Sequence, residues 1–312
     1  MANIHISPFL CLFFILVNVI PHSADETQPT IFILGDSTAD VGTNTYLPGS
    51  KVRANFSQYG IDFPHSRPTG RFSNGFNSAD FVARFFGLKR SPPPFLFLLT
   101  LKSNHFQKHL LKGVNFASAG SGLLDITGPY MYNARDLFIG ILISAYSNHI
   151  TNLYRLGARK FGIISVPPVG CCPSQRLLQK LINGVDGCFP PQNDFALAFH
   201  SALDTLLVNI SSQLPGFKYS LGNGYLMTMD VINNPRASGF DNVDSACCGY
   251  GILNSEGPCN STASLCPDRR KYLFWDQFHP TKRAAFLAAQ TLYNGPPYYV
   301  SPINFSQLAK DY

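Results

Sequence analysis

The sequence predicts an α/β fold in which helices cover a mostly parallel, five-stranded sheet. Two observations lead to this prediction. Short apolar runs alternate with amphipathic segments along the chain, and the run "KFGIISV" at Lys160–Val166 is apolar throughout, as in strands that are buried on both faces. Hydrophobic residues make up 45% of the 312 residues, enough for one sizeable core. We therefore expect a single domain over residues 25–312.

Five short apolar segments are the expected strands. They are Ile31–Leu34, Gly113–Phe116, Asp136–Ile139, Lys160–Val166 and Phe217–Leu221. The third, "DLFI", has only four residues and is followed almost at once by a helical pattern, so we expect a truncated third strand.

Four segments have apolar residues at helical spacing. The expected helices are Ser78–Phe86, Ile141–Leu156, Asp194–Leu214 and Thr281–Tyr293. Gly157 just after the second, and Pro215-Gly216 after the third, are typical of helix ends.

The N-terminus carries an apolar run, Phe9–Ile20, followed by Pro21 to Ala24. Twelve residues are too few to span a bilayer, and the pattern is typical of a signal peptide. We expect residues 1–24 to be removed and the protein to be secreted into the extracellular space or cell wall. A buried helix or a membrane anchor is the alternative. No later stretch is expected to span a membrane.

The small fraction of charged residues and the N-x-S/T sequons are both typical of secreted proteins. Charged residues are only 13% of the chain, and the net charge of +6 is scattered rather than gathered into Lys/Arg blocks, which disfavours nucleic acid as a partner. We expect a monomer. Four N-x-S/T sequons are candidate glycosylation sites: Asn55, Asn209, Asn260 and Asn304.

Seven cysteines follow the N-terminal run: Cys171, Cys172, Cys188, Cys247, Cys248, Cys259 and Cys266. They show no C-x-x-C spacing, so we expect disulfides and no metal. Adjacent cysteines seldom bond to each other. Cys171 or Cys172 is expected to pair with Cys188. Cys247 and Cys248 are expected to pair with Cys259 and Cys266, in either order, and one thiol stays free.

Three residues could carry nucleophilic chemistry. Ser37 follows the first expected strand in "LGDS", at the sheet edge where α/β folds bind ligands. A serine needs a neighbouring base. His279, three residues after Asp276 in "WDQFHPT", could be that base, with the carboxylate orienting the imidazole. Each motif is weak alone, and a turn serine is the plain alternative.

Several ordered segments resemble the plant-type GDSL esterase/lipase family of the SGNH hydrolase superfamily. They are "FILGDSTADVGTN" (32–44), "YGIDFPHSRPTGRFSNG" (59–75), "GVNFASAGSGLL" (113–124), "LYRLGARKFGIISVPPVGCCPSQ" (153–175), "ACCGYG" (246–251) and "YLFWDQFHPT" (272–281). The resemblance covers most of the chain. It implies a three-layer α/β/α fold of the SGNH or flavodoxin-like kind.

The resemblance also implies roles. Ser37 would be the nucleophile and its N–H one oxyanion donor, with Gly120 the second donor and Ser121 the fallback. His279 would be the base and then the acid, and Asp276 would orient it. The implied reaction is ester hydrolysis through an acyl-enzyme, without a metal or organic cofactor.

One family block, Gly-x-Asn-Asp after the third strand, is not found here. Its Asn would give a third oxyanion donor, and neither Asn133 nor Asn148 replaces it convincingly. The chain reads as if a segment had been cut near Gly140. A skipped exon, a weakened enzyme and an inactive binder are the open explanations.

We therefore expect a secreted serine esterase or lipase acting on a carboxylic ester or acyl lipid. The alternatives are an impaired or inactive family member that binds lipids or esters as a secreted glycoprotein, and a disulfide-linked structural glycoprotein.

Overall fold

The computed structural model describes residues 13–18, 29–124 and 135–310. Its largest sheet contains β1 (Phe13–Asn18), β2 (Thr30–Leu34), β3 (Gly113–Asn115), β4 (Lys160–Ile164), β5 (Lys218–Gly222) and β10 (Val300–Ser301). Two small two-stranded sheets pair β6 (Asn242–Ala246) with β9 (Tyr272–Phe274), and β7 (Cys248–Gly249) with β8 (Ser264–Leu265).

The described α-helices are α1 (Thr43–Tyr46), α2 (Ser78–Phe85), α3 (Phe95–Leu98), α4 (Ser103–Leu110), α5 (Arg135–Arg155), α6 (Pro173–Asn183), α7 (Pro190–Gln213), α8 (Gly224–Asn233), α9 (Lys282–Asn294) and α10 (Phe305–Lys310). Side-chain caps fix two of the helix starts near the site. Asn77 and Asp80 form a reciprocal capping box at α2, and Thr281 accepts a bond from Ala284 N–H at α9.

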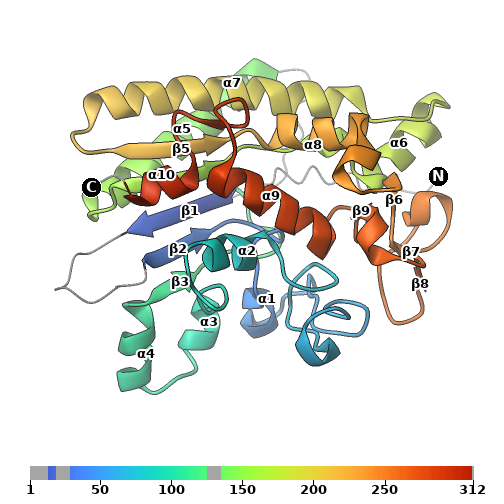
Figure 1. Cartoon of the computed structure of the whole chain (residues 1–312), viewed down its shortest axis with the longest axis horizontal. Helices are drawn as coiled ribbons and strands as arrows, with labels where there is room; N and C mark the ends of the chain where they lie inside the picture. The colour runs from blue at the N-terminus through green and yellow to red at the C-terminus, as the bar shows by residue number, and fades with distance from the viewer. Residues whose placement is uncertain (1–12, 19–28, 125–134, 311–312) are drawn as a thin grey trace.

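Helices cover both faces of the large sheet (Figure 1). Ile31 and Ile33 of β2 pack with α2, α9 and α10 on one face. Their neighbours Phe32 and Leu34 pack towards α5 and α7 on the other. This alternation is what a strand buried on both sides requires. The described chain is thus a mixed α/β structure with helix, sheet and helix layers.

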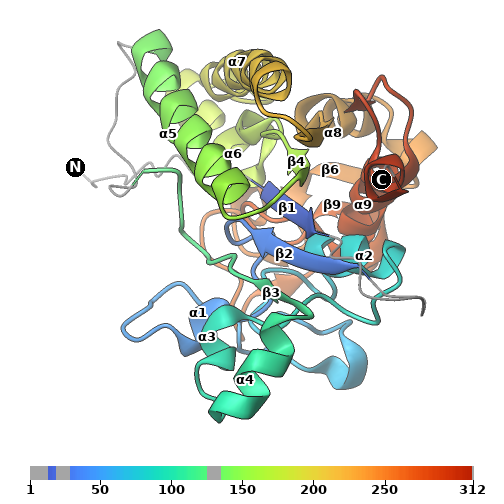
Figure 2. The same ribbon diagram turned by 90° about the vertical axis from the view of Figure 1, so that its left-hand side faces the viewer.

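The strand order across the large sheet is β10-β5-β4-β1-β2-β3. Figure 2 shows the part of this order from β4 through β1 and β2 to β3. β2 is parallel to β3, and β4 is parallel to β5. β1 is antiparallel to both β2 and β4, and β10 is antiparallel to β5. The expected five-stranded, mostly parallel sheet is therefore corrected to six strands, of which the N-terminal strand and the last strand run against the others.

The expected strands at 31–34, 113–116, 160–166 and 217–221 correspond to β2, β3, β4 and β5. The expected third strand is wrong, because Asp136–Ile139 lies in the first turns of α5. Ile139 continues the buried stripe of Leu142, Tyr146 and Ile150 along that helix. A four-residue apolar run cannot by itself distinguish a strand from the start of an amphipathic helix.

Strand β1 lies inside the segment 1–24 that the sequence assigns to a signal peptide. Removal of that segment stays a prediction.

Helix α7 is, against expectation, long and apolar enough by length and composition to be a candidate membrane span. However, Phe199, Leu203 and Leu207 of α7 are fully buried in the core against β4 and β5. These contacts are those of a core helix.

Candidate active site

Ser37 lies in a tight turn at the carboxyl end of β2. Asp36 shapes the turn, since its Oδ1 accepts bonds from the N–H (2.9 Å) and the hydroxyl (2.7 Å) of Thr38. Its carbonyl accepts from the N–H groups of Ala39 and Asp40. Parallel strands end at the ligand-binding edge of an α/β sheet, so the turn places Ser37 at that edge.

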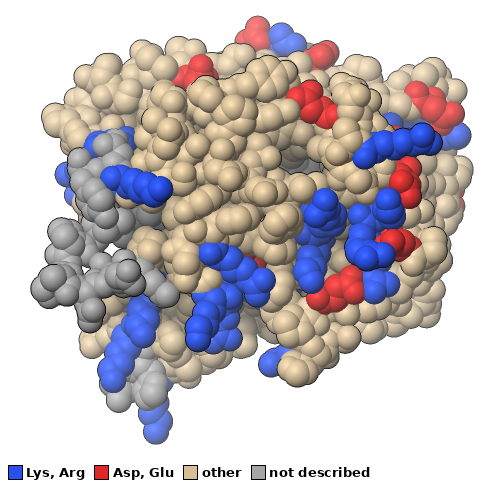
Figure 3. Space-filling model, viewed as in Figure 1, with Lys and Arg blue, Asp and Glu red and all other residues tan. Residues whose placement is uncertain are grey.

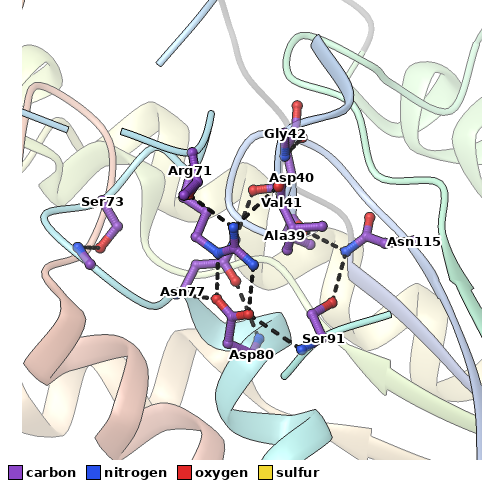
Figure 4. A network of polar contacts seen from close by, with 12 residues as sticks. Ala39, Asp40, Val41, Gly42, Arg71, Ser73, Asn77, Asp80, Ser91 and Asn115 are labelled. Carbon is purple, nitrogen blue, oxygen red and sulfur yellow. Dashed lines mark hydrogen bonds and ion pairs between the residues drawn. The ribbon is translucent and has the colours of Figure 1, made fainter. Parts of the chain in front are cut away.

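A buried polar network holds the chain that follows Ser37 (Figure 4). Asp40 Oδ1 accepts from the N–H groups of Gly42 (2.7 Å) and Thr43 (2.6 Å), and Oδ2 accepts from Ala119 (3.1 Å). Burial raises the pKa of Asp40, although these N–H groups oppose the shift. Asn77 donates to the carbonyl of Asp40 (2.9 Å).

A buried ion pair anchors the same network. Arg71 binds Asp80 in a two-point contact, Nε to Oδ2 at 2.6 Å and Nη2 to Oδ1 at 2.8 Å. Arg71 also donates to the carbonyl of Val41. From the β3 side, Asn115 donates to the carbonyl of Ala39 (2.9 Å). The loop after Ser37 is thereby fixed from α2 and from β3 (Figure 4).

The three residues singled out from the sequence meet at one point. Ser37 Oγ lies 2.8 Å from Nε2 of His279. Nδ1 of His279 lies 2.7 and 2.8 Å from the two carboxylate oxygens of Asp276. Ser37, Asp276 and His279 expose only 6%, 4% and 8% of their surface, so solvent is largely kept from the hydrogen bonds. This is the geometry by which a histidine can take a proton from a serine hydroxyl.

The charges of the group support that proton transfer. Burial lowers the pKa of His279, but the carboxylate of Asp276 and, less strongly, Asp36 outweigh it, so the pKa is raised above its ordinary value. Burial raises the pKa of Asp276, but the charge and hydrogen bond of His279 outweigh it and the pKa is lowered. Asp276 therefore stays ionised and favours a protonated imidazole.

The structure adds a residue to the group that sequence reasoning missed. The hydroxyl of Tyr59 donates to Oδ2 of Asp276 at 2.8 Å and is buried. Burial and then the nearby carboxylate hold the pKa of Tyr59 well above its usual range, so it remains a donor. Tyr59 opens the family-like segment 59–75, but only the fold brings it to a partner 217 residues away.

The turn that carries Gly120 is bound to the nucleophile segment. The carbonyl of Gly35 accepts from Ser118 N–H (3.0 Å) and from the Ser121 hydroxyl (2.9 Å). Gly120 has φ +84°, a conformation that favours glycine. Within residues 29–124 and 135–310, no hydrogen bond from the N–H groups of Ser37 and Gly120 is found.

A third donor from an asparagine is not found among the described residues. The amides nearest the loop are already used: Asn44 donates to Val52 and Ala119, Asn77 to Asp40 and Asn115 to Ala39. Asn148 lies in α5, and Asn133 lies outside the described residues.

The cysteines form three disulfides, Cys171–Cys188, Cys247–Cys266 and Cys248–Cys259. Cys172 is the free thiol. Burial, followed by the charge of Asp276, raises its pKa to about 12, so it stays neutral and is a poor nucleophile. Among the described residues, no group of His, Cys, Asp and Glu could hold a metal ion.

The four sequons differ in exposure. Asn55 and Asn209 are exposed, whereas Asn260 and Asn304 are half-buried. Asn304 Nδ2 also donates to the carbonyl of Gly295 at 3.2 Å. On the face in Figure 3, Lys and Arg lie in separate small groups rather than in one continuous patch.

A cavity of about 710 Å³ opens between α8 and α9, where the face in Figure 3 is hollowed. Its wall includes Met227, Val231, Phe240, Leu287 and Leu292. Thr38, Phe278 and Pro280, the chain neighbours of Ser37 and His279, also line it. The cavity is therefore mostly apolar and lies next to the triad.

Comparisons with known proteins show which family this chain resembles. A family model described as GDSL-like Lipase/Acylhydrolase matches residues 31–135 and 133–292, so the match breaks at residues 133–135. GDSL esterase/lipase At1g71250 of Arabidopsis thaliana is 32% identical over 373 aligned positions, covering 98% of this chain and 97% of that protein. GDSL esterase/lipase 6 of the same plant is 30% identical, covering 96% of each chain.

The alignment with the first relative is longer than the 312 residues of this chain, because that relative contains segments that this chain lacks. The break in the family match lies close to Gly140, where the sequence predicts a missing segment. Two nearly full-length matches and a family model over most of the sequence lead to one conclusion: the chain belongs to the GDSL esterase/lipase family.

Proposed function

We propose that this chain is a secreted serine esterase that hydrolyses carboxylic esters through an acyl-enzyme on Ser37. The observation that carries the proposal is the hydrogen-bonded series from Ser37 Oγ through His279 to Asp276, with every member buried. The three disulfides support secretion, because such bonds persist in oxidising compartments.

In this mechanism Ser37 Oγ attacks the ester carbonyl carbon while its proton passes to Nε2 of His279. The carbonyl oxygen becomes an oxyanion that accepts from the N–H groups of Ser37 and Gly120. His279 then returns the proton to the departing alkoxide, which leaves the acyl group on Ser37. Water, deprotonated by His279, then attacks the acyl carbon. As the bond to Ser37 Oγ breaks, His279 returns that proton to Oγ, so that the acid leaves and the serine is restored.

The lack of a third, asparagine donor among the described residues lowers the turnover that we expect. Losing one oxyanion donor typically costs a factor of about 10²–10³ in turnover. With Ser37 and Gly120 as the two proposed donors, we expect a slow hydrolase rather than an inactive one.

Labelling with a fluorophosphonate tests the proposal, because this probe reacts only with an activated serine. We expect one phosphonylated residue, Ser37, in the mass spectrum of the folded chain, and none in Ser37→Ala. Ser121→Ala is the matched control, since its serine lies in the neighbouring turn. Equal labelling of wild type and Ser37→Ala would remove the nucleophile assignment.

A second candidate is a lipid-binding protein that turns its ligand over poorly or not at all. The apolar cavity beside the triad favours it, because a fatty acyl chain could enter there. A fluorescent fatty acid that binds the wild type, combined with no fluorophosphonate labelling of Ser37, would favour this function over hydrolysis.

A further inference from the structure

Strand β1 is the one hydrogen-bonded link between two halves of the large sheet. On one side lie β2 and β3, which are parallel, and on the other lie β4 and β5, which are also parallel. In the described sheet β2 and β4 do not pair with each other, because β1 lies between them and is antiparallel to both (Figure 2). Neighbouring strands are about 4.8 Å apart, so the gap that β1 fills is one strand wide.

The register of the strands shows which backbone groups of β2 face this gap. The carbonyl of Ile33 accepts from Phe116 N–H, so Ile33 turns its polar groups towards the β3 side. Alternate residues of a strand point their backbone groups in opposite directions. Phe32 and Leu34 therefore face β1, and they are the partners of Leu16 and Phe14 in the register.

The same argument applies across the gap. Ser165 N–H donates to the carbonyl of Gly222 on the β5 side, so Ile163 also faces β5. Gly162 and Ile164 then face β1, opposite Ile15 and Phe13. Without a strand between them, both rows of backbone groups would lose their partners inside the sheet, which is costly.

The sequence of β1 suits a central strand. Residues 13–18 read "FFILVN", rich in β-branched and aromatic residues and without proline. The segment expected to form a third strand, Asp136–Ile139, is part of helix α5 and does not fill this position.

We propose that the position between β2 and β4 is a strand-binding slot for an extended apolar peptide, and that residues 13–18 of this chain are its occupant. Cleavage near Ala24 would separate residues 13–18 from the rest of the chain. The slot could then release this strand or bind another extended peptide. This inference concerns the sheet and does not depend on ester hydrolysis.

Amide hydrogen exchange on the folded full-length chain, followed by NMR, is the first test. We expect the amides of residues 13–18 to be protected together with those of Phe32, Leu34, Gly162 and Ile164. Exchange of residues 13–18 at the rate of an unstructured peptide, with the other four still protected, would overturn the proposal.

The second test cuts the occupant free after folding. A specific protease site replaces residues 22–25 in the full-length chain, and the cut protein is passed over a sizing column. We expect the N-terminal peptide to stay bound. An excess of a lysine-tagged peptide with the sequence of residues 12–19 should displace it, and the same peptide with Leu16→Pro should not, because proline removes a ladder hydrogen bond.

Prolonged dialysis of the cut protein, with no free peptide present, removes the N-terminal peptide, and amide exchange on this form gives an internal control. Amides that face the slot should exchange at least about tenfold faster, whereas Ile33 and Ile163, which face away, should be nearly unchanged. Release of the peptide with no change at Phe32, Leu34, Gly162 and Ile164 would overturn the slot, as would displacement by the proline peptide.

Discussion

At the scale of single residues, Asp276 is the best-held group of the candidate site. Its oxygens accept from the imidazole and the N–H of His279, from the N–H of Phe278 and from the hydroxyl of Tyr59. These bonds fix both the carboxylate and the ring that it orients. The orientation of the His279 ring towards Ser37 depends on this one buried anion.

Replacing Tyr59 with phenylalanine removes one of these bonds while keeping the aromatic ring. A hydrogen bond to a charged group contributes about 1.5–3 kcal/mol, so we expect kcat to fall by about tenfold or more with little change in KM. Tyr154→Phe is the matched control, since that hydroxyl donates to Pro215, outside the site. Equal kcat values for the two variants would contradict a positioning role for Tyr59.

The raised pKa of His279 predicts the acid side of the pH profile. The base must be neutral to accept the proton of Ser37, so kcat/KM should fall as the pH drops through the pKa of the free enzyme. We expect that midpoint above the ordinary histidine value of about 6.5. In Asp276→Asn the midpoint should move to lower pH, with turnover about 10⁴-fold lower, because the raising charge is gone. A midpoint that does not move would contradict this origin of the shift.

At the scale of elements, the buried pair between Arg71 and Asp80 connects α2 to the loop after Ser37. Arg71→Met leaves Asp80 buried without its partner, which typically costs about 3–5 kcal/mol in the free energy of unfolding. Urea denaturation measures this loss. Lys180→Met is the control, because its pair with Asp186 is exposed and contributes at most about 1 kcal/mol. Similar losses in both variants would contradict the anchoring role.

The sequence predicts elements well where an apolar pattern is long. The core stripe of α7 and the continuous apolar run of β4 were both found close to their expected bounds. Prediction fails at short runs, as Asp136–Ile139 shows, because four residues carry no distinguishable period. Strand β1 was not among the expected strands, since an apolar N-terminal run fits a signal peptide as well as a central strand, and removal of residues 1–24 stays a prediction.

At the scale of the whole molecule, the disulfides hold the loops around the site. They close loops with sequence separations of 17, 19 and 11 residues. Loops of this length gain about 3 kcal/mol per bond in the chain-entropy model, so reduction should lower the melting temperature strongly. Cys172→Ala should leave that sensitivity unchanged, because Cys172 is free. A reduced protein that melts at the temperature of the oxidised one would contradict this prediction.

The candidate site could be predicted from the sequence only in part, because some of its contacts join residues that are far apart in the chain. Ser37, Asp276 and His279 stand in recognisable local motifs, and the fold brings them together. Tyr59 and Asp40 act through contacts with residues 217 and 79 positions away, which no local pattern encodes.

The most direct measurement is hydrolysis of a short-chain aryl ester by the purified wild-type chain beside Ser37→Ala and His279→Ala. We predict slow turnover by the wild type and loss of activity in both variants, because nucleophile and base act as a unit. Hydrolysis by Ser37→Ala at the wild-type rate would show that Ser37 does not form the acyl-enzyme.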